Sequence, residues 1–424
     1  MQPQLPKGTR EFKPEDKILR DKIVNTLKEV FELYGYAPLE TPILERFDAL
    51  ASKYAGGAEI LKEAFKLKDQ GQRELGLRYD LTVPLAIYIA TNPNIKLPFK
   101  RYEIGEVFRD GPITSARYRQ FAQCDVDIVG CKELLADAEI MALTDSAFKK
   151  IGLDAYIKVN NRKLLDDVLN FFGIDESKFE TAILSLDKLE KFGTQVVKNE
   201  LIEKNVEDAV ATKIIDIVKV KGTNIERISK LKNILKKSDG LKEVEGLLGY
   251  LELMGIKAEF DASLARGLAY YTGTVFEIFL ANSNVKSAVA AGGRYDKMIG
   301  SLVGNKEYPA VGISFGLDRI YDALIEKQPT KVKTPTKAYV VPIKMLGDAI
   351  NIVKTLRQNG INSDIDLMGR SPSKNLEYAN SLGVPHVIFV GEEEIKQNKV
   401  KLRDMKSGKE EMLTMEDVIK KLKQ

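Results

Sequence analysis

The chain has 424 residues, 44% of them hydrophobic, which is enough for two or three domains with sizeable cores. Its net charge is +4, its first residues lack the apolar core of a signal peptide, and nowhere do 18 uncharged apolar residues run together. These features exclude a membrane-spanning protein and predict a globular protein of the cytoplasm with no membrane partner.

The scarcity of histidine and cysteine removes several kinds of catalytic chemistry. His386 is the one histidine, and Cys124 and Cys131 are the two cysteines. A Ser-His-Asp triad, a Cys-His pair, a histidine-rich metal site, a zinc-thiolate site and a disulfide framework are therefore not expected. We interpret His386, in "GVPHVIFV", as a structural residue.

The first third of the chain predicts a helix followed by extended segments. Apolar residues at helical spacing, among them Ile23, Leu27 and Val30, predict a helix over residues 16–34 that ends at Gly35. "YAPLETPIL" predicts an extended segment. "KRYEIGEVFR" and "QFAQCDVDIVG" are strand-like, and "DGPITSARYRQ" joins them. We expect two antiparallel strands connected by a mobile basic loop.

The second of these strands has one polar face. Phe121, Gln123, Asp125 and Asp127 alternate with apolar residues, so they point to the same side of a sheet. Asp80 lies in "LRYDLTVP", ahead of a helix-like segment. Acidic residues in this pattern form a metal site, a general acid/base pair, a pocket for a cationic ligand, or structural salt bridges. Spacing alone leaves these four open.

One arginine is expected to be both ordered and buried. Residues 160–255 are helical by pattern and rich in Lys, Glu, Ile and Leu, as in an inserted helical domain, and "ARGLAYYTGTVFEIF" follows them. Here Arg266 directly precedes a run that reads as a buried strand. Burying a guanidinium without a partner costs several kcal/mol, and arginine keeps its proton. The stretch therefore predicts an anionic partner for Arg266.

Two further arginines occur where order is expected. Arg109 ends a predicted strand, and "VGISFGLDRIYDALIEK" predicts a strand, a glycine and a helix with Arg319 in its first turn. One guanidinium group can bind two phosphate oxygens at once, and the dipole at a helix N-terminus also favours an anion. With Arg266, they predict a polyphosphate ligand. Because neither GxxxxGK[ST] nor a convincing GxGxxG occurs, neither a Walker-type nor a Rossmann phosphate site is expected.

The C-terminal part of the chain predicts a separate domain. "KQPTKVKTPTK" is a linker that marks a boundary near residue 330. Strand-like "KAYVVPI" and "HVIFV" alternate with helical "GDAINIVKTLRQNG" and "SKNLEYANSLG", which indicates a small α/β domain. Residues 331–424 hold 17 Lys and Arg against 12 Asp and Glu. This excess of positive charge indicates either a polyanionic partner or a solvated surface.

Four separated motifs resemble those of the class II aminoacyl-tRNA synthetases and, within them, the histidyl-tRNA synthetase family. "LETPILE" resembles the first motif, at the dimer interface; "FRDGPITSARYRQFAQCDVDIVG" resembles the second, a strand-loop-strand on ATP; "AVGISFGLDRI" resembles the third; and "RGLAYYTGTVFE" resembles the histidine-specific motif. The likeness covers nearly the whole chain. It implies an α+β catalytic core built on an antiparallel sheet over residues 1–330, interrupted by a helical insertion at 160–255, and a C-terminal α/β anticodon-binding domain at 331–424.

The resemblance also implies a function and a set of site residues. The chain would activate L-histidine with ATP and Mg²⁺ to histidyl-adenylate and pyrophosphate, transfer histidine to the 3′ end of its cognate tRNA, and act as a homodimer. Arg266 and Arg109 would be catalytic, at the α-phosphate. Histidine would be bound by Asp80, Thr82 and Gln123 at its α-amino group, by Asp127, Tyr270 and Tyr271 at its imidazole, and by Tyr295, which closes the pocket. ATP would be bound by Arg109, Arg117, Phe121 at the adenine, Arg266 and Arg319. No protein side chain is assigned as a metal ligand.

The chain departs from the family pattern in two places. Asp110 and Gly111 stand where many members carry a glutamate two residues after the arginine of the second motif, so the contact to the adenine amine is not assigned. Asp127 replaces a longer glutamate, which would shift the imidazole or recruit a water.

Two other functions were weighed against this one. The regulatory subunit of ATP phosphoribosyltransferase resembles a synthetase core, but it usually lacks the C-terminal domain and has a degraded histidine-specific motif. A synthetase for another amino acid, such as proline, threonine or glycine, is disfavoured by Asp127 and the adjacent Tyr270 and Tyr271, which suit a ring with N–H groups.

Overall fold

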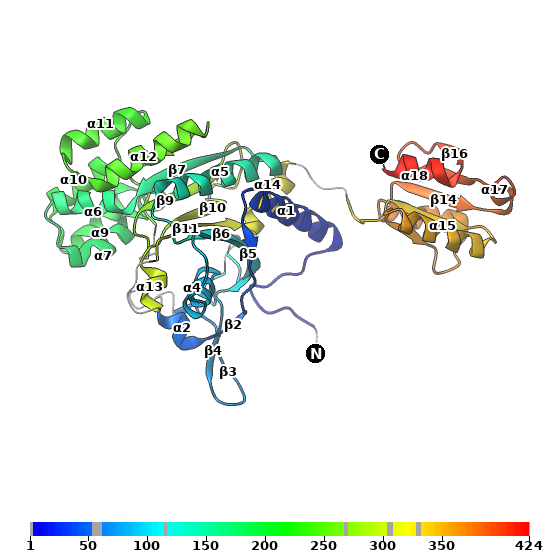
Figure 1. Ribbon diagram of the computed structural model, residues 1–424, viewed down its shortest axis with the longest axis horizontal. Helices are drawn as coiled ribbons and strands as arrows, with labels where there is room; N and C mark the ends of the chain where they lie inside the picture. Colours follow the sequence, from blue (N-terminus) through cyan, green and yellow to red (C-terminus); the bar gives the residue numbers. More distant parts are fainter. Residues whose placement is uncertain are drawn as a thin grey trace. The chain divides into compact units, whose positions relative to one another are not determined.

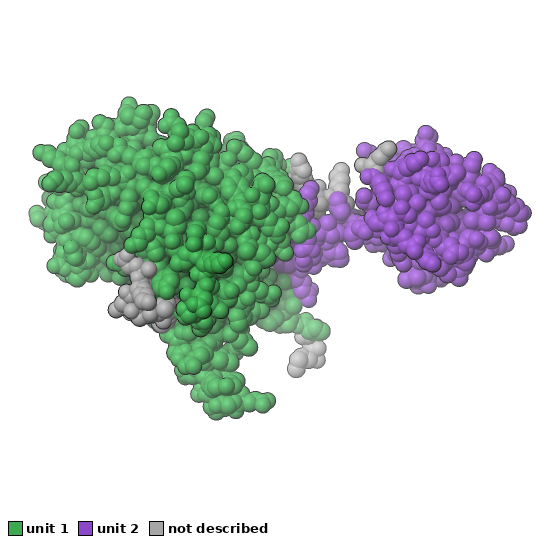
Figure 2. All heavy atoms as spheres, viewed as in Figure 1, with its two compact units in different colours: residues 1–10, 23–327 green, residues 11–22, 328–424 purple. Residues whose placement is uncertain are grey.

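The computed structural model describes residues 3–52, 62–113, 117–266, 270–302, 308–327 and 332–423. The chain divides into two compact units, one of residues 1–10 and 23–327 and the other of residues 11–22 and 328–424 (Figure 2). Among the described helices, none has the length and apolar character needed to cross a lipid bilayer.

The first unit is built on an eight-stranded sheet. In spatial order its strands are β1 (Ala37–Pro38), β5 (Phe99–Phe108), β6 (Gln120–Val129), β11 (Ala310–Gly316), β10 (Ala290–Arg294), β9 (Thr274–Leu280), β7 (Ala155–Asn161) and β8 (Ala258–Phe260). All neighbours pair antiparallel except β1 with β5 and β7 with β8, at the two edges. The predicted antiparallel core is confirmed, and its outermost pairs make the sheet mixed.

Helices cover both faces of this sheet. They are α1 (Pro14–Leu33), α5 (Leu134–Ile151) and α14 (Leu317–Lys327) on one side and α4 (Thr82–Thr91) and α13 (Met298–Leu302) on the other (Figure 1). On the first side the ring of Phe315 packs against Phe148 and Phe31, with centroids 5.8 and 5.5 Å apart. Since side chains alternate along a strand, this apolar contact leaves the neighbouring Ser314 facing α4. The helix predicted over residues 16–34 is confirmed as α1.

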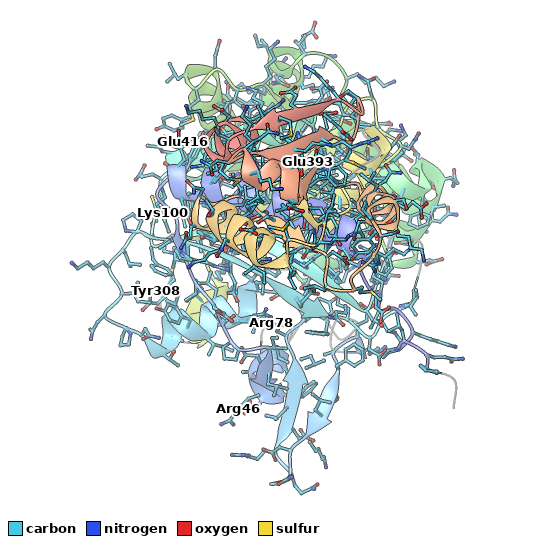
Figure 3. The ribbon with its side chains drawn as sticks, turned by 90° about the vertical axis from the view of Figure 1, so that its right-hand side faces the viewer. Arg46, Arg78, Lys100, Tyr308, Glu393 and Glu416 are labelled. Carbon is cyan, nitrogen blue, oxygen red and sulfur yellow. The ribbon has the colours of Figure 1, made fainter. Side chains whose placement is uncertain are left out.

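A smaller three-stranded sheet stands beside the main one. It consists of β2 (Leu44–Arg46), β4 (Glu74–Leu77) and β3 (Lys66–Lys68), with α2 (Phe47–Ser52) packed against it. Arg78 follows β4 directly and lies where this sheet meets the main one (Figure 3). Its guanidinium is buried and donates to the Glu106 carbonyl of β5 at 2.8 Å, which ties the two sheets together.

Helices fill most of the chain between β7 and β8. They are α6 (Arg162–Phe171), the short 3-10 helix η1 (Glu176–Lys178), α7 (Phe179–Leu186), α8 (Leu189–Phe192), α9 (Thr194–Glu203), α10 (Asp208–Val218), α11 (Asn224–Ile234) and α12 (Asp239–Leu253). Their apolar faces form one buried cluster that includes Leu165, Ile214 and Val244. The pattern that predicted helices here is confirmed.

The second unit carries a five-stranded sheet of its own. The strand order is β13 (Ser363–Ile365), β12 (Ala338–Pro342), β14 (His386–Val390), β15 (Val400–Asp404) and β16 (Glu410–Leu413). Its helices are α15 (Leu346–Gln358), α16 (Pro372–Ser381), α17 (Glu392–Lys396) and α18 (Met415–Lys423). The first three strands are parallel and the last two antiparallel, so the predicted α/β alternation is confirmed. His386 begins β14, and its Nδ1 lies 3.3 Å from the Lys337 carbonyl.

Candidate functional site

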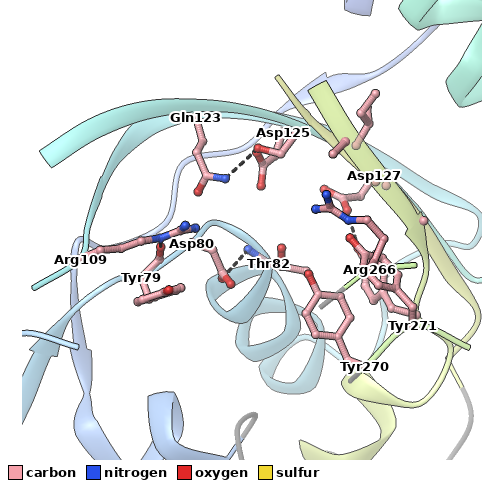
Figure 4. A pocket seen from close by; sticks show the side chains of 17 residues that line it. Tyr79, Asp80, Thr82, Arg109, Gln123, Asp125, Asp127, Arg266, Tyr270 and Tyr271 are labelled. Carbon is pink, nitrogen blue, oxygen red and sulfur yellow. Dashed lines mark hydrogen bonds between the residues drawn. The ribbon is translucent and has the colours of Figure 1, made fainter. Parts of the chain in front are cut away.

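A cavity of about 170 Å³ lies on the α4 side of the main sheet (Figure 4). Segments far apart in the chain line it, because adjacent strands of the sheet come from distant parts of the sequence. Its lining residues are Tyr79, Asp80, Thr82, Arg109, Gln123, Asp125, Asp127, Arg266, Tyr270, Tyr271, Ala291, Gly292, Gly293, Tyr295, Gly312, Ile313 and Ser314. Nine of the twelve residues assigned from the resemblance are among them; Arg117, Phe121 and Arg319 are not. Residues 267–269 of the histidine-specific motif lie outside the described residues.

The floor of the cavity is set by the register of β5, β6 and β11. Asp127 stands opposite Arg101 on one side and Gly312 on the other, while Asp125 stands opposite Glu103 and Ser314. Directly opposed residues of neighbouring strands share a face of the sheet. The polar face predicted for β6 therefore continues onto β5, through Arg101 and Glu103, and onto β11, through Ser314.

Asp127 is held from both sides. Its Oδ1 accepts a hydrogen bond from the Tyr295 hydroxyl, and its Oδ2 lies 2.9 Å from Nη2 of Arg101 in an ion pair. Gly312 provides the space, because a Cβ there would fall 1.9 Å from Asp127 Oδ1. Burial raises the pKa of Asp127, and the positive charge of Arg101 opposes that rise.

Arg101 was missed by the sequence analysis although it is fully buried. It donates to the Leu81 carbonyl at 3.0 Å and lies 3.5 Å from Glu103 Oε2. Burial alone would lower the pKa of Arg101, but the negative charges of Asp127, Asp125 and Glu103 outweigh this effect and raise the pKa overall. The guanidinium therefore stays charged. A signal was present in "KRYEIG", where Arg101 and Glu103 alternate with apolar residues in a strand as the acids of β6 do.

Asp125 and Gln123 each present an oxygen to the cavity. Gln123 Nε2 donates to Ser314 Oγ at 2.7 Å, whereas Gln123 Oε1 and Asp125 Oδ1 are buried and have no hydrogen-bond partner among the residues that the structure describes. Burial raises the pKa of Asp125 to about 7, Asp127 adds to the rise, and Arg101 and Ser314 counteract it. Asp125 was recognised as part of the polar face but not as a site residue.

This raised pKa predicts a pH-dependent stability. The folded-state pKa of Asp125 lies above its unfolded value, so its contribution is complete below about pH 4 and is lost as the pH rises through about 7. We expect the free energy of unfolding of the unliganded protein to fall across this range by on the order of 3 kcal/mol more than that of Asp125→Asn. Urea unfolding of both proteins at pH 4.5 and 7.5 measures the difference. An equal change in the free energy of unfolding between the two pH values for both proteins would contradict the prediction.

At the mouth of the cavity Arg109 is held by aromatic rings. Its guanidinium carbon lies 4.2 Å from the centroid of Tyr79 and 5.0 Å from that of Phe121, and Nε donates to the Tyr79 carbonyl at 3.3 Å. Such stacking fixes an arginine while leaving its terminal N–H groups able to bind an anion. Phe121, assigned to the adenine, thus contacts Arg109. Arg117 is partly exposed and pairs with Glu63 at 2.6 Å.

Arg266 has an anionic partner within the protein. Its Nη1 forms an ion pair with Glu277 of β9, which the sequence analysis did not identify, and its buried Nε has no hydrogen-bond partner among the described residues. Burial alone would lower its pKa, but Tyr271, Glu277 and Tyr270 raise it overall. The alternation of "TVFEIF", with one acid inside a buried strand, was the available signal.

Arg319 belongs to the same group of cations. It is the third residue of α14, is exposed, and donates to the Ala288 carbonyl. Desolvation lowers the pKa of Arg319, and the charges of Arg266 and Arg109 lower it further against the opposing effect of Glu277. Arg319 therefore interacts electrostatically with two arginines that line the cavity, although it does not line the cavity itself.

The remaining assigned residues also reach the cavity. Asp80 Oδ1 accepts from the backbone N–H groups of Thr82 and Val83 at 3.0 and 2.9 Å and so fixes the start of α4. Tyr270 packs on Tyr271 with centroids 4.6 Å apart and meets the edge of Tyr295 at 6.1 Å. These rings and the carboxylates line the same cavity as Arg109 and Arg266 (Figure 4).

Comparisons with known proteins agree along the whole chain. The family model described as "Histidyl-tRNA synthetase" matches residues 8–320, and the one described as "Anticodon binding domain" matches residues 337–424. Over 410 residues the chain is 44% identical to histidine–tRNA ligase 1 of Bacillus cereus, covering 95% of this chain and 96% of that one.

Solved structures extend the likeness to three dimensions. The crystal structure of histidyl-tRNA synthetase from a Nostoc species has a TM-score of 0.89 and 31% identity over 100% of this chain and 99% of that one. An ATP phosphoribosyltransferase regulatory subunit/histidyl-tRNA synthetase from Bacillus halodurans has a TM-score of 0.76 over 91% of this chain and 97% of its own. At 22% identity, this second likeness shows the fold alone.

Proposed function

The chain belongs to the histidyl-tRNA synthetase family and is a histidine–tRNA ligase, and we propose that its cavity on the α4 side of the main sheet is where L-histidine and ATP react. The observation that carries this proposal is that one cavity is lined both by the carboxylates of Asp80, Asp125 and Asp127 and by the guanidinium groups of Arg109 and Arg266. An amino acid with a cationic head and a polyphosphate need opposite charges, and the cavity offers both.

The carboxylates and tyrosines of the cavity would hold histidine. Asp80, Thr82 and Gln123 would bind the α-ammonium group, since carboxylate, hydroxyl and amide oxygens all accept hydrogen bonds. Tyr270, Tyr271 and Tyr295 would enclose the imidazole on the side of Asp127. This arrangement leaves the carboxylate of histidine directed towards the arginines.

The arginines would hold the phosphates. Arg109 and Arg266 would bind the α-phosphate, and Arg319 would bind the terminal phosphate or lie along the adenine. A carboxylate oxygen of histidine attacks the α-phosphorus, the bond from that phosphorus to the bridging oxygen breaks, and pyrophosphate leaves. Negative charge gathers on the α-phosphoryl oxygens during this step, and cations already in place lower the barrier without reorganising.

Transfer to tRNA completes the reaction. A ribose hydroxyl at the 3′ end of the tRNA attacks the carbonyl carbon of histidyl-adenylate, and AMP leaves.

We propose that two residues outside the cavity lining change their contacts when ATP binds. Phe121 would contact the adenine after Arg109 has moved onto the phosphate, and Arg117 would exchange Glu63 for a phosphate oxygen.

Mg²⁺ is expected to accompany ATP. Within the part of the chain that the structure describes, no group of three or more His, Cys, Asp or Glu side chains could hold a metal ion. Mg²⁺ usually binds through substrate phosphates and only one or two carboxylates. When bound with ATP, the ion would add positive charge to the phosphates.

ATP–pyrophosphate exchange with each standard amino acid in turn tests the proposal. We expect exchange with L-histidine and none above background with proline, threonine or glycine. Exchange with another amino acid would overturn the assignment of the carboxylates and tyrosines to histidine, and exchange with none would favour a binding protein on the same fold.

We further propose that the catalytic core spans residues 1–330 with the helices of 160–255 inserted, that residues 331–424 bind the anticodon, and that the protein acts in the cytoplasm as a homodimer. The excess of Lys and Arg in the C-terminal segment and the anticodon-binding family match support a tRNA contact there. The assigned contacts to histidine and ATP all precede residue 330.

This division predicts that the two half-reactions separate. A chain shortened to end at Lys327 should still form histidyl-adenylate, whereas tRNA charging should fall steeply because the phosphate contacts of the anticodon region are lost. Exchange and charging are measured on the same preparation, after circular dichroism and gel filtration have established that it is folded. If a folded shortened chain charged tRNA as fast as the full chain, the anticodon assignment would be wrong.

A further inference from the structure

We propose that Glu63 binds the adenine of ATP by accepting a hydrogen bond from its exocyclic amine. The inference rests on the proposed function, because it concerns the nucleotide that Phe121 and Arg109 would contact. Gly111 stands where many related chains carry a glutamate, so the second motif leaves the contact to this amine open. Glu63 belongs to a different segment of the chain, outside all four motifs.

The carboxylate of Glu63 occupies the space beside Gly111. A Cβ on Gly111 would fall 2.9 Å from both Cδ and Oε1 of Glu63, which is too close without a shift of one of them. The backbones of the two segments are also joined, since the N–H of Asp110 donates to the Glu63 carbonyl at 2.6 Å. A carboxylate from one segment therefore stands at the root of the side chain that the other segment lacks.

Glu63 also lies at the edge of the aromatic rings that hold Arg109. The Tyr79 hydroxyl donates to Glu63 Oε2 at 3.2 Å, and Tyr79 lines the cavity. The Arg109 guanidinium lies over the ring of Tyr79 (Figure 4) and over that of Phe121. A planar base that took its place on Phe121 would lie over Tyr79 as well. The carboxylate at the Tyr79 hydroxyl would then face the edge of this base.

The charge of Glu63 suits an amine at that edge. Arg117 Nη2 lies 2.6 Å from both carboxylate oxygens, and the proposed exchange of Glu63 for a phosphate oxygen would free them as ATP binds. An ionised carboxylate only accepts hydrogen bonds, so it favours the amine of adenine and disfavours the carbonyl oxygen that guanine carries at the same position. The side chain is 21% exposed, so this hydrogen bond would be largely shielded from water.

Pyrophosphate exchange with histidine and two triphosphates tests the assignment in the full-length protein. Purine riboside 5′-triphosphate is ATP without the exocyclic amine. Both carry the same phosphates, so any change in how Arg117 binds phosphate cancels in the ratio of their kcat/KM values. We expect the wild type to prefer ATP by roughly 10- to 100-fold, as for a hydrogen bond to a charged group, and Glu63→Ala to lose most of this preference. Glu74→Gln, at an exposed glutamate of β4, should keep it.

Two further variants test where the amine lies. The amide of Glu63→Gln can donate as well as accept, so this variant should use GTP better relative to ATP than the wild type does. Gly111 has no positive φ, so its backbone tolerates a side chain once Glu63 is shortened. The double variant Glu63→Ala/Gly111→Glu should therefore regain much of the preference for ATP over purine riboside 5′-triphosphate. A folded double variant that regained none would contradict the position beside Gly111.

A folded Glu63→Ala protein with the wild-type preference for ATP would overturn the assignment and leave Glu63 as a counter-charge of Arg117 alone. A wild type that uses purine riboside 5′-triphosphate as well as ATP would also overturn it. If Glu63→Ala does not fold, the ratio of GTP to ATP use in Glu63→Gln decides, and an unchanged ratio counts against the inference. Failure of the proposed function would look different, because the wild type would then show no exchange with histidine and ATP.

Discussion

Replacing Arg266 with glutamine is expected to slow formation of histidyl-adenylate by on the order of 10²–10³, while histidine still binds. A preorganised donor at the developing charge typically contributes this much, and Arg266 lines the cavity with its Nε unpartnered among the described residues. Single-turnover adenylate formation gives the rate, and calorimetry gives the affinity for histidine. Arg357→Gln, an exposed arginine of α15, serves as the matched control.

The ion pair with Glu277 provides a sharper control for this experiment. Arg266→Gln leaves the largely buried Glu277 without its partner, so part of any loss could arise from an uncompensated carboxylate. The double variant Arg266→Gln/Glu277→Gln removes both charges. If it formed adenylate at nearly the wild-type rate, the loss in the single variant would come from Glu277, and Arg266 would have no direct role at the phosphate.

Replacing Arg101 with methionine is expected to destabilise the protein by about 3–5 kcal/mol. The side chain is fully buried between Asp127 and Glu103, and removing one partner of a buried pair leaves uncompensated charge in a medium of low polarity. Methionine fills a similar length, so the loss reports mainly on charge. Urea unfolding at constant pH measures it.

The destabilisation caused by replacing Arg101 with methionine is expected to depend on pH. Without Arg101 the pKa values of Asp125 and Asp127, already raised by burial, rise further, and their stabilising contribution is lost as the pH increases. The variant should therefore be less destabilised at pH 5 than at pH 8. Adding Asp127→Asn should recover part of the stability at pH 8. A variant as stable as the wild type at both pH values would show that this buried pairing contributes nothing.

Much of the fold was accessible from local pattern. The apolar stripe of α1, the alternation in β6 and the strand-helix alternation after residue 331 each reflect a period set by backbone geometry, and each was confirmed. The motifs at Asp80, Arg109, Gln123 and Arg266 pointed to the cavity because each lies at the end of a predicted element or on its polar face.

The interaction partners of individual residues were harder to predict from the sequence, because strand pairing brings together residues that are far apart in the chain. Arg266 was predicted to be buried beside an anion, but its partner Glu277 became evident only when β9 was placed next to the turn. Likewise Gly312 reads as an ordinary strand glycine until β11 is paired with β6, where any Cβ would meet Asp127.

By itself, the sequence determined the kinds of element, their order, the polar face of β6 and the family whose motifs the chain carries, since these depend on neighbours in the chain. Only the tertiary structure decided which buried carboxylates form ion pairs with which arginines. Arg101 pairs with Asp127 and Glu103, Arg78 pairs with Glu103, and Asp125 Oδ1 and Asp127 Oδ2 are buried without a hydrogen-bond partner among the described residues. The physical reason is that a buried charge takes its pKa and its role from groups within a few ångströms, and three adjacent strands from separate parts of the chain bring those groups together.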